Sequence, residues 1–130
     1  MEKARATFSK RERIVSKKLV EELFDRGNSH ALTAFPLRMV YMLRERAQGD
    51  EPVQVLISVP KKRLRHAVDR NRVKRQVREA YRQNKQTLLD VVPEGQQMVA
   101  AFVWQSEQLS PTASVEGRVK NLLRRAAERL

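Results

Sequence analysis

The segment from His66 to Leu88 constrains the fold of this 130-residue chain most strongly, because it contains neither proline nor glycine and has a helical period. At 100° per residue its apolar side chains form a stripe roughly 100° wide. That stripe consists of Val73, Val77, Ala80, Tyr81 and Leu88. Basic side chains fill a broad arc beside it. The pattern predicts a helix that buries an aliphatic edge and presents a basic face.

Two segments account for the whole net positive charge of the chain. The sequence has 27 Lys and Arg against 15 Asp and Glu, a formal net charge of +12. Residues 61–85 hold eleven basic and two acidic side chains, residues 1–18 hold seven basic and two acidic ones, and the remainder sums to −2. Because a charge that serves solubility would be spread out, this concentration predicts binding of a polyanion, nucleic acid first of all.

An ordinary solvated helix is the alternative for the basic segment. Such helices usually mix signs, whereas here cations recur at i, i+4 and only Glu79, four residues after Arg75, offers relief within the helix. Guanidinium groups form a planar fork that suits phosphate. A face made almost only of cations carries few side chains that could read bases, and the chain has no heptad pattern for dimerisation. Structured RNA is therefore favoured over duplex DNA.

Periodicity and turn residues predict two further helices. Ser16 is expected to cap a short helix, and Gly27 is expected to end it in the left-handed conformation. The apolar face of this helix is formed by Leu19, Val20, Leu23 and Phe24. A final helix is expected over residues 112–130. Its inner face is formed by Val115, Val119, Leu122, Leu123 and Ala126.

Three strands are predicted, at residues 37–43, 53–59 and 98–104. The turn residues at 48–52 favour an antiparallel hairpin between the first two. The third is apolar enough to be covered on both faces. With no repeats and no long linker, the expected order is α-β-β-α-β-α in one α+β domain.

The residues argue against a self-sufficient enzyme. Cysteine is absent, which excludes disulfides, thiolate zinc sites and cysteine nucleophiles. Neither His30 nor His66 has an obvious partner, and His66 is expected on the buried side of the basic helix. We find no P-loop and no metal-ligand spacing, so no catalytic residue and no metal ligand is assigned. The longest apolar run has seven residues, against roughly 20 needed to span a bilayer, and neither membrane insertion nor secretion is expected.

One contiguous string is more specific than these patterns. Val59-Pro60-Lys61-Lys62 is followed after four residues by the sequence AVDRNRVKRQVREAYR, which ends at Arg82. This string resembles the signature of the bacterial ribonuclease P protein family. That signature is a strand ending in Lys-Lys, a short basic loop, and a helix bearing Arg-Asn-Arg, Lys-Arg and Arg-Glu. The order of elements also agrees from about residue 8 onward.

The resemblance implies an α+β fold of order αβββαβα, described as ribosomal protein S5 domain 2-like. A mixed sheet with a left-handed β-α-β crossover is part of that fold, an exception to the usual right-handed rule. It adds one strand to our pattern, which a short strand near residues 31–36 would supply. Residues 1–130 then form one domain, with residues 1–13 as a basic N-terminal arm.

The resemblance also implies a function. The chain would be the protein subunit that joins a catalytic RNA, one to one, to remove the 5′ leader of precursor tRNA in the cytoplasm. Mg²⁺ held mainly by the RNA would drive hydrolysis. No membrane and no small-molecule substrate is expected. The alternative is a non-catalytic RNA-binding protein of ribosomal or RNA-chaperone type. A binder of anionic membranes is a third possibility, but the apolar stripe is too narrow for it.

Site residues are carried over by position. The RNA-contacting helix face would comprise Arg70, Asn71, Arg72, Lys74, Arg75, Arg78 and Arg82, with Lys61, Lys62 and Arg65 at its entrance. Val20, Phe24 and Tyr41 would line a cleft for the single-stranded leader, where each stacked base is worth about 1–3 kcal/mol. Val20 stands where the family often has an aromatic residue, which puts the base preference in question. Plain packing is the alternative for Phe24 and Tyr41.

Overall fold

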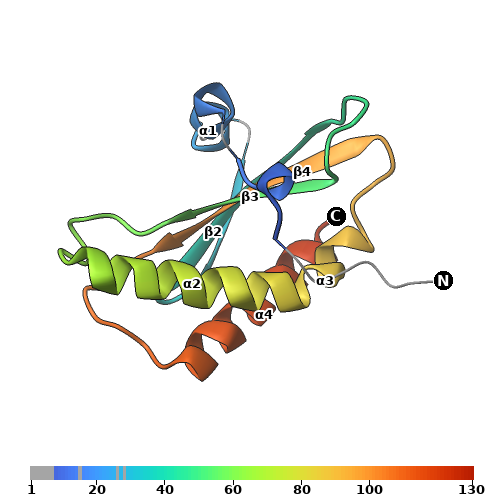
Figure 1. The fold of residues 1–130 in the computed structure, drawn as a ribbon. Coiled ribbons are helices and arrows are strands. Elements are labelled where there is room, and N and C mark those ends of the chain that lie inside the picture. The colour runs from blue at the N-terminus through green and yellow to red at the C-terminus, as the bar shows by residue number, and fades with distance from the viewer. Residues whose placement is uncertain (1–7, 15, 26, 28) are drawn as a thin grey trace.

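The computed structural model describes residues 8–14, 16–25, 27 and 29–130. A four-stranded sheet separates two long helices on one face from a short helix on the other (Figure 1). The elements in chain order are a 3-10 turn η1 (Lys10–Glu12), α1 (Lys17–Leu23), β1 (His30–Ala34), β2 (Leu37–Glu45), β3 (Val53–Ser58), α2 (Ala67–Asn84), α3 (Gln86–Leu89), β4 (Gln96–Trp104) and α4 (Thr112–Glu128). The expected α+β domain with its additional short strand is confirmed.

The sheet is mixed, with strand order β1-β2-β4-β3. β1 and β2 pair antiparallel, and β2 pairs antiparallel with β4 over nine positions, from Leu37↔Trp104 to Glu45↔Gln96. β3 pairs parallel with β4, through a crossover that contains α2. The hairpin predicted between β2 and β3 is therefore wrong. β4 lies between them because a strand buried on both faces gains most from a central position. The left hand of the crossover stays a prediction.

Alternation along β2 divides the apolar side chains between two cores. Leu37, Met39 and Tyr41 face α2 and α4 and join the larger core. Val40 and Met42 face the other way and join a smaller core beneath α1. The predicted inner faces of the two long helices are confirmed, since every residue assigned to them is buried. The helix predicted to run to Leu88 instead ends at Asn84, and Leu88 lies in the separate turn α3.

The first helix begins where predicted but ends earlier. The Ser16 side chain accepts a hydrogen bond from the backbone N–H of Leu19 at 3.2 Å, as expected of a cap. The helix ends at Leu23 with Phe24 as its C-cap, and Gly27 does not have a positive φ. The predicted left-handed end at Gly27 is wrong. Its N–H instead donates to the Asp25 carboxylate at 3.1 Å, a local turn that competes with helix.

Candidate RNA interface

The outer side of α2 carries cations whose side chains have no partner among the residues that the structure describes. Arg72, Arg75 and Arg78 are exposed and Lys74 is half-buried. Within the described part of the chain, none of the four makes a hydrogen bond or ion pair with another residue. Asn71 is exposed among them. The arrangement leaves four positive charges along one helix free to meet an external anion.

The buried side of α2 fixes the direction of that outer side. Val73, Val77 and Tyr81 pack into the larger core. Gln76, only 7% exposed, donates through Nε2 to the Ser110 carbonyl at 3.2 Å and to the Thr112 hydroxyl at 3.0 Å. These contacts tie α2 to the start of α4, so the cations project from a rigid support.

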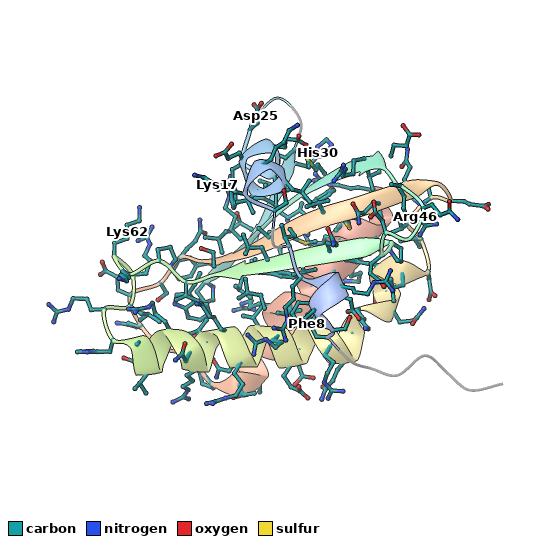
Figure 2. The ribbon with its side chains drawn as sticks, turned by 45° about the horizontal axis from the view of Figure 1, so that its top comes forward. Phe8, Lys17, Asp25, His30, Arg46 and Lys62 are labelled. Atoms are coloured by element: carbon teal, nitrogen blue, oxygen red, sulfur yellow. The ribbon has the colours of Figure 1, made fainter. Side chains whose placement is uncertain are left out.

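Arg70 has a different role from its neighbours. Its guanidinium is half-buried and donates to the carbonyl oxygens of Leu64 at 2.9 Å and Arg65 at 2.7 Å. It thereby holds the basic loop before α2 against the first turn of the helix. Lys61, Lys62 and Arg65 are exposed on that loop, and Lys62 lies at its tip in Figure 2. His66, expected on the buried side, is exposed at the N-cap of α2, so that expectation is wrong.

Arg82 is also engaged within the protein. We expected Glu79 to offset Arg75, but it pairs with Arg82, whose Nε lies 3.0 Å from Glu79 Oε2. The hydrogen bond from Arg82 lowers the pKa of Glu79 below its ordinary value, and the same bond raises the pKa of Arg82. Gln83 donates to the same carboxylate at 3.1 Å. The charge of Arg82 is thus balanced locally.

The N-terminal segment, residues 8–14, extends the basic surface beyond α2. The sequence predicted the charge of this segment but not its position beside the helix. The Phe8 ring packs edge-on against Tyr81 with centroids 5.6 Å apart, and Figure 2 shows Phe8 beside α2. The Arg13 guanidinium lies 5.3 Å from the centre of the Phe8 ring. A groove of about 230 Å³ lies between this segment, the β3 edge and α2. Its lining includes Phe8, Arg13, Val55, Ile57, Lys74 and Arg78.

The expected cleft beside the first helix contains only part of its predicted lining. Phe24 is 43% exposed and lines a hollow of about 370 Å³ with Arg38 and Val40 of β2. Val20 is half-buried against the smaller core. Tyr41 is 2% exposed and faces the larger core on the opposite side of the sheet. Neighbouring residues of a strand point to opposite faces, so Val40 faces the hollow beside Phe24 and Tyr41 faces away from it. Placing Tyr41 in one cleft with Phe24 is therefore wrong.

Comparison with known proteins identifies the family. The family model described as Ribonuclease P matches residues 8–127. The chain belongs to the ribonuclease P protein family. It is 42% identical over 125 residues to the ribonuclease P protein component of Porphyromonas gingivalis strain ATCC 33277, covering 94% of this chain and 89% of that one. Its identity to the Chlorobium phaeobacteroides component is 40% over 92 residues, which is 68% of this chain and 61% of that one.

Solved structures of ribonuclease P proteins share the fold. The Staphylococcus aureus protein superposes with a TM-score of 0.64 at 17% identity, over 88% of this chain and 94% of that one. The Thermotoga maritima protein superposes with a TM-score of 0.62 at 24% identity, over 88% of this chain and 96% of that one.

Membership in the family settles the class of function. The ribonuclease P protein is a subunit of the endoribonuclease that processes tRNA, and it has an RNA partner in that ribonucleoprotein. The expected family and enzyme class are confirmed, and these comparisons give no support to a ribosomal or chaperone protein. Among the described residues, no three His, Asp or Glu side chains are grouped so that they could hold a metal ion. No described helix is long and apolar enough to cross a membrane.

Proposed function

We propose that this chain binds the catalytic RNA of ribonuclease P through the outer side of α2, one copy per RNA, in the cytoplasm. The observation that carries the proposal is a set of four cations whose side chains have no partner in the described part of the chain: Arg72, Lys74, Arg75 and Arg78. Three of them are guanidinium groups, which match phosphate geometry in two parallel hydrogen bonds. Asn71 and the exposed loop cations Lys61, Lys62 and Arg65 continue this surface.

Arg70 and Arg82 contribute to RNA binding in a secondary way under this proposal. The Arg70 guanidinium orders the loop that carries Lys61 and Lys62 through its two carbonyl contacts. Arg82 is balanced by Glu79 and adds little net attraction for phosphate. The strength of RNA binding should therefore depend most on the middle of α2.

The hollow beside α1 is the proposed site for the single-stranded leader of precursor tRNA. It combines an exposed aromatic ring, Phe24, with a cation, Arg38, and the apolar side chain of Val40. Stacking on an aromatic ring together with charge along the backbone is how proteins bind single strands with little sequence preference. Val20 is half-buried nearby and supplies apolar packing rather than a second ring.

Phosphodiester hydrolysis is proposed to depend on Mg²⁺ held mainly by the RNA. The ion supplies charge stabilisation and an activated water when bound. The described residues offer no cluster of carboxylates for it, whereas the basic surface can neutralise phosphates as the RNA and its substrate approach each other. The protein alone is therefore expected to be inactive.

Reconstitution tests the proposal as a whole. The protein mixed with its cognate RNA at low-millimolar Mg²⁺ should accelerate 5′ cleavage of precursor tRNA well beyond the RNA alone. A general RNA-binding protein would instead bind precursor and mature tRNA equally. Cleavage that is no faster with the protein would refute the proposal.

Phe24→Ala tests the leader site within the reconstituted enzyme. Loss of a stacked base worth about 1–3 kcal/mol should weaken precursor tRNA binding about 5- to 150-fold and leave mature tRNA binding unchanged. Tyr41→Phe is the control, because the Tyr41 hydroxyl is buried on the opposite face without a hydrogen-bond partner in the described structure. It should change neither affinity. Equal losses for both tRNAs with Phe24→Ala would assign Phe24 to folding.

A further inference from the structure

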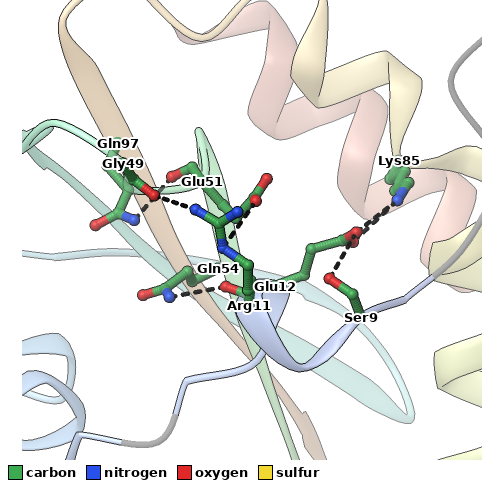
Figure 3. Close-up of polar contacts among 8 residues, drawn as sticks. All are labelled: Ser9, Arg11, Glu12, Gly49, Glu51, Gln54, Lys85 and Gln97. Atoms are coloured by element: carbon green, nitrogen blue, oxygen red, sulfur yellow. Dashed lines mark hydrogen bonds and ion pairs between the residues drawn. The ribbon is translucent and has the colours of Figure 1, made fainter.

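One ion pair joins the N-terminal segment to the end of α2. Lys85, which is only 8% exposed, places its Nζ 2.9 Å and 3.0 Å from the two carboxylate oxygens of Glu12 (Figure 3). The side chains of this pair are 10% and 14% exposed. Arg11 and Glu51, which pair at 3.5 Å nearby, are 67% and 30% exposed. A shielded pair of this kind is weakened little by salt, and breaking it leaves a buried charge.

Glu12 is the acidic residue of a basic segment that lies against a basic helix. Residues 8–14 hold three cations and a single acid, Glu12. Such a segment is repelled by the cations of α2, yet it lies against that helix. The contact between Glu12 and Lys85 offsets this repulsion at the one place where the segment carries a negative charge. Apolar contact of Phe8 with Tyr81 adds to it.

The docked segment brings a further cation to α2. The Ile14 N–H donates to the Val55 carbonyl at 3.2 Å. The Gln54 side chain donates to the Arg11 carbonyl at 3.0 Å (Figure 3). These bonds hold the segment along the edge of β3. Arg13 then lines the same groove as Lys74 and Arg78. Without docking, Arg13 would be tethered only by the chain.

We propose that Glu12 is a positioning residue for RNA binding: its ion pair with Lys85 docks the basic N-terminal segment so that Arg13, Lys74 and Arg78 face one stretch of RNA backbone together. This inference rests on the proposed function, in which α2 binds the RNA. The family signature places the RNA-binding surface on α2 and its entry loop. The docked N-terminal segment, residues 8–14, extends that surface.

Replacing Glu12 should change the RNA affinity in the direction opposite to the one that net charge alone predicts. Removing an acid from a basic surface ordinarily strengthens attraction to a polyanion. Here Glu12→Gln should weaken RNA binding, because the released segment takes Arg13 away from the groove. Glu51→Gln removes the same charge from an exposed pair next to the same segment, so it is the matched control. It should leave RNA affinity unchanged or slightly raised.

Two readouts test the docking and its consequence with the full chain. In hydrogen exchange without RNA, protection of the Ile14 amide should fall at least tenfold in Glu12→Gln and stay unchanged in Glu51→Gln. With the RNA subunit, Glu12→Gln should bind about fivefold more weakly. The slope of log K against log salt should be shallower by about 0.7–0.9, the effect of one lost phosphate contact. The double variant Glu12→Lys with Lys85→Glu restores the pair in reverse and should recover both properties.

The outcomes separate the inference from the proposed function. A wild-type protein that fails to bind the RNA subunit refutes the proposed function. Wild-type binding together with equal or tighter binding by Glu12→Gln refutes the positioning role. Loss of amide protection throughout α4 in Glu12→Gln would mean that this variant unfolds more generally. Arg13→Ala is then the deciding variant: it should keep the Ile14 amide protected and still bind the RNA more weakly. Normal RNA affinity of Arg13→Ala would overturn the inference.

Discussion

The helices α2 and α4 lie on the same face of the sheet and are similar in length, 18 and 17 residues, yet their basic side chains have different partners. On α4, the Arg118 Nε donates to the Phe35 carbonyl at 2.9 Å, and the Arg125 NH1 group donates to the Thr33 carbonyl at 2.8 Å. Lys120 pairs with a glutamate one turn away. Three of the four cations of α4 therefore have partners within the protein, and two of these three join the helix to the first hairpin of the sheet.

The cations of α2 are arranged the other way. Only Arg70 and Arg82 among its basic residues have hydrogen bonds within the described structure, and the four between them point outward without partners. Both helices have more basic than acidic residues, so net charge alone does not distinguish them. What distinguishes an RNA-binding helix from a structural one is how many of its charges are already satisfied by the protein.

Truncation of the inner faces should show what the two helices share. Leu122 of α4 and Val77 of α2 are both fully buried in the larger core. Leu122→Ala should lower the free energy of unfolding by about 2–5 kcal/mol, through lost transfer energy and the cavity left behind. Val77→Ala should cost less, because it removes fewer atoms. Urea unfolding measures both, and a negligible loss for Leu122→Ala would show that α4 does not support the core.

Truncation of the outer faces should separate the helices. Removing Arg75 and Arg78 together by alanine should weaken binding of the RNA subunit by at least about a hundredfold, because each charge-assisted hydrogen bond to phosphate contributes about 1.5–3 kcal/mol. Alanine at Lys120 and Arg124 of α4 removes the same formal charge and should have little effect. Filter-binding titrations compare the two double variants. Equal losses would mean that general charge, rather than placement, determines RNA affinity.

Conservative replacement should produce the smallest effect. A lysine at position 70 keeps the charge, but its side chain is shorter by one atom than that of Arg70, whose NH1 group donates to both loop carbonyls, at 2.9 Å and 2.7 Å. Arg70→Lys should weaken RNA binding a few-fold through a looser entry loop. Arg118→Lys loses an equivalent carbonyl contact on α4 and should leave RNA affinity unchanged. An unaltered affinity for Arg70→Lys would show that the loop needs no such support.

Local patterns in the sequence predicted the parts of the fold that depend on local periodicity. The buried stripes of α2 and α4 follow from helical spacing, and Ser16 was identifiable as a cap from its position. The pairing of β3 with β4 was not predictable in this way. It depends on which strand occupies the centre of the sheet. The turn between β2 and β3 favoured a hairpin of these two strands, but the apolar β4 lies between them.

The candidate site was predictable in composition but not in the use of each charge. Glu79 has a cation on either side, at Arg75 and Arg82, and spacing could not decide which one it pairs with. The side of the sheet that Tyr41 faces was equally undetermined, because both faces of β2 are apolar. The Glu12–Lys85 pair joins residues 73 positions apart, and no local pattern reports such a contact.

The salt dependence of RNA binding tests most directly the claim that the outer side of α2 meets phosphate. The slope of log K against log salt should be measured for the wild type and for the two alanine double variants. Loss of Arg75 and Arg78 should make the slope shallower by about 1.4–1.8, since each lost phosphate contact removes about 0.7–0.9. Loss of Lys120 and Arg124 should leave it unchanged. The same slope for all three proteins would contradict the account.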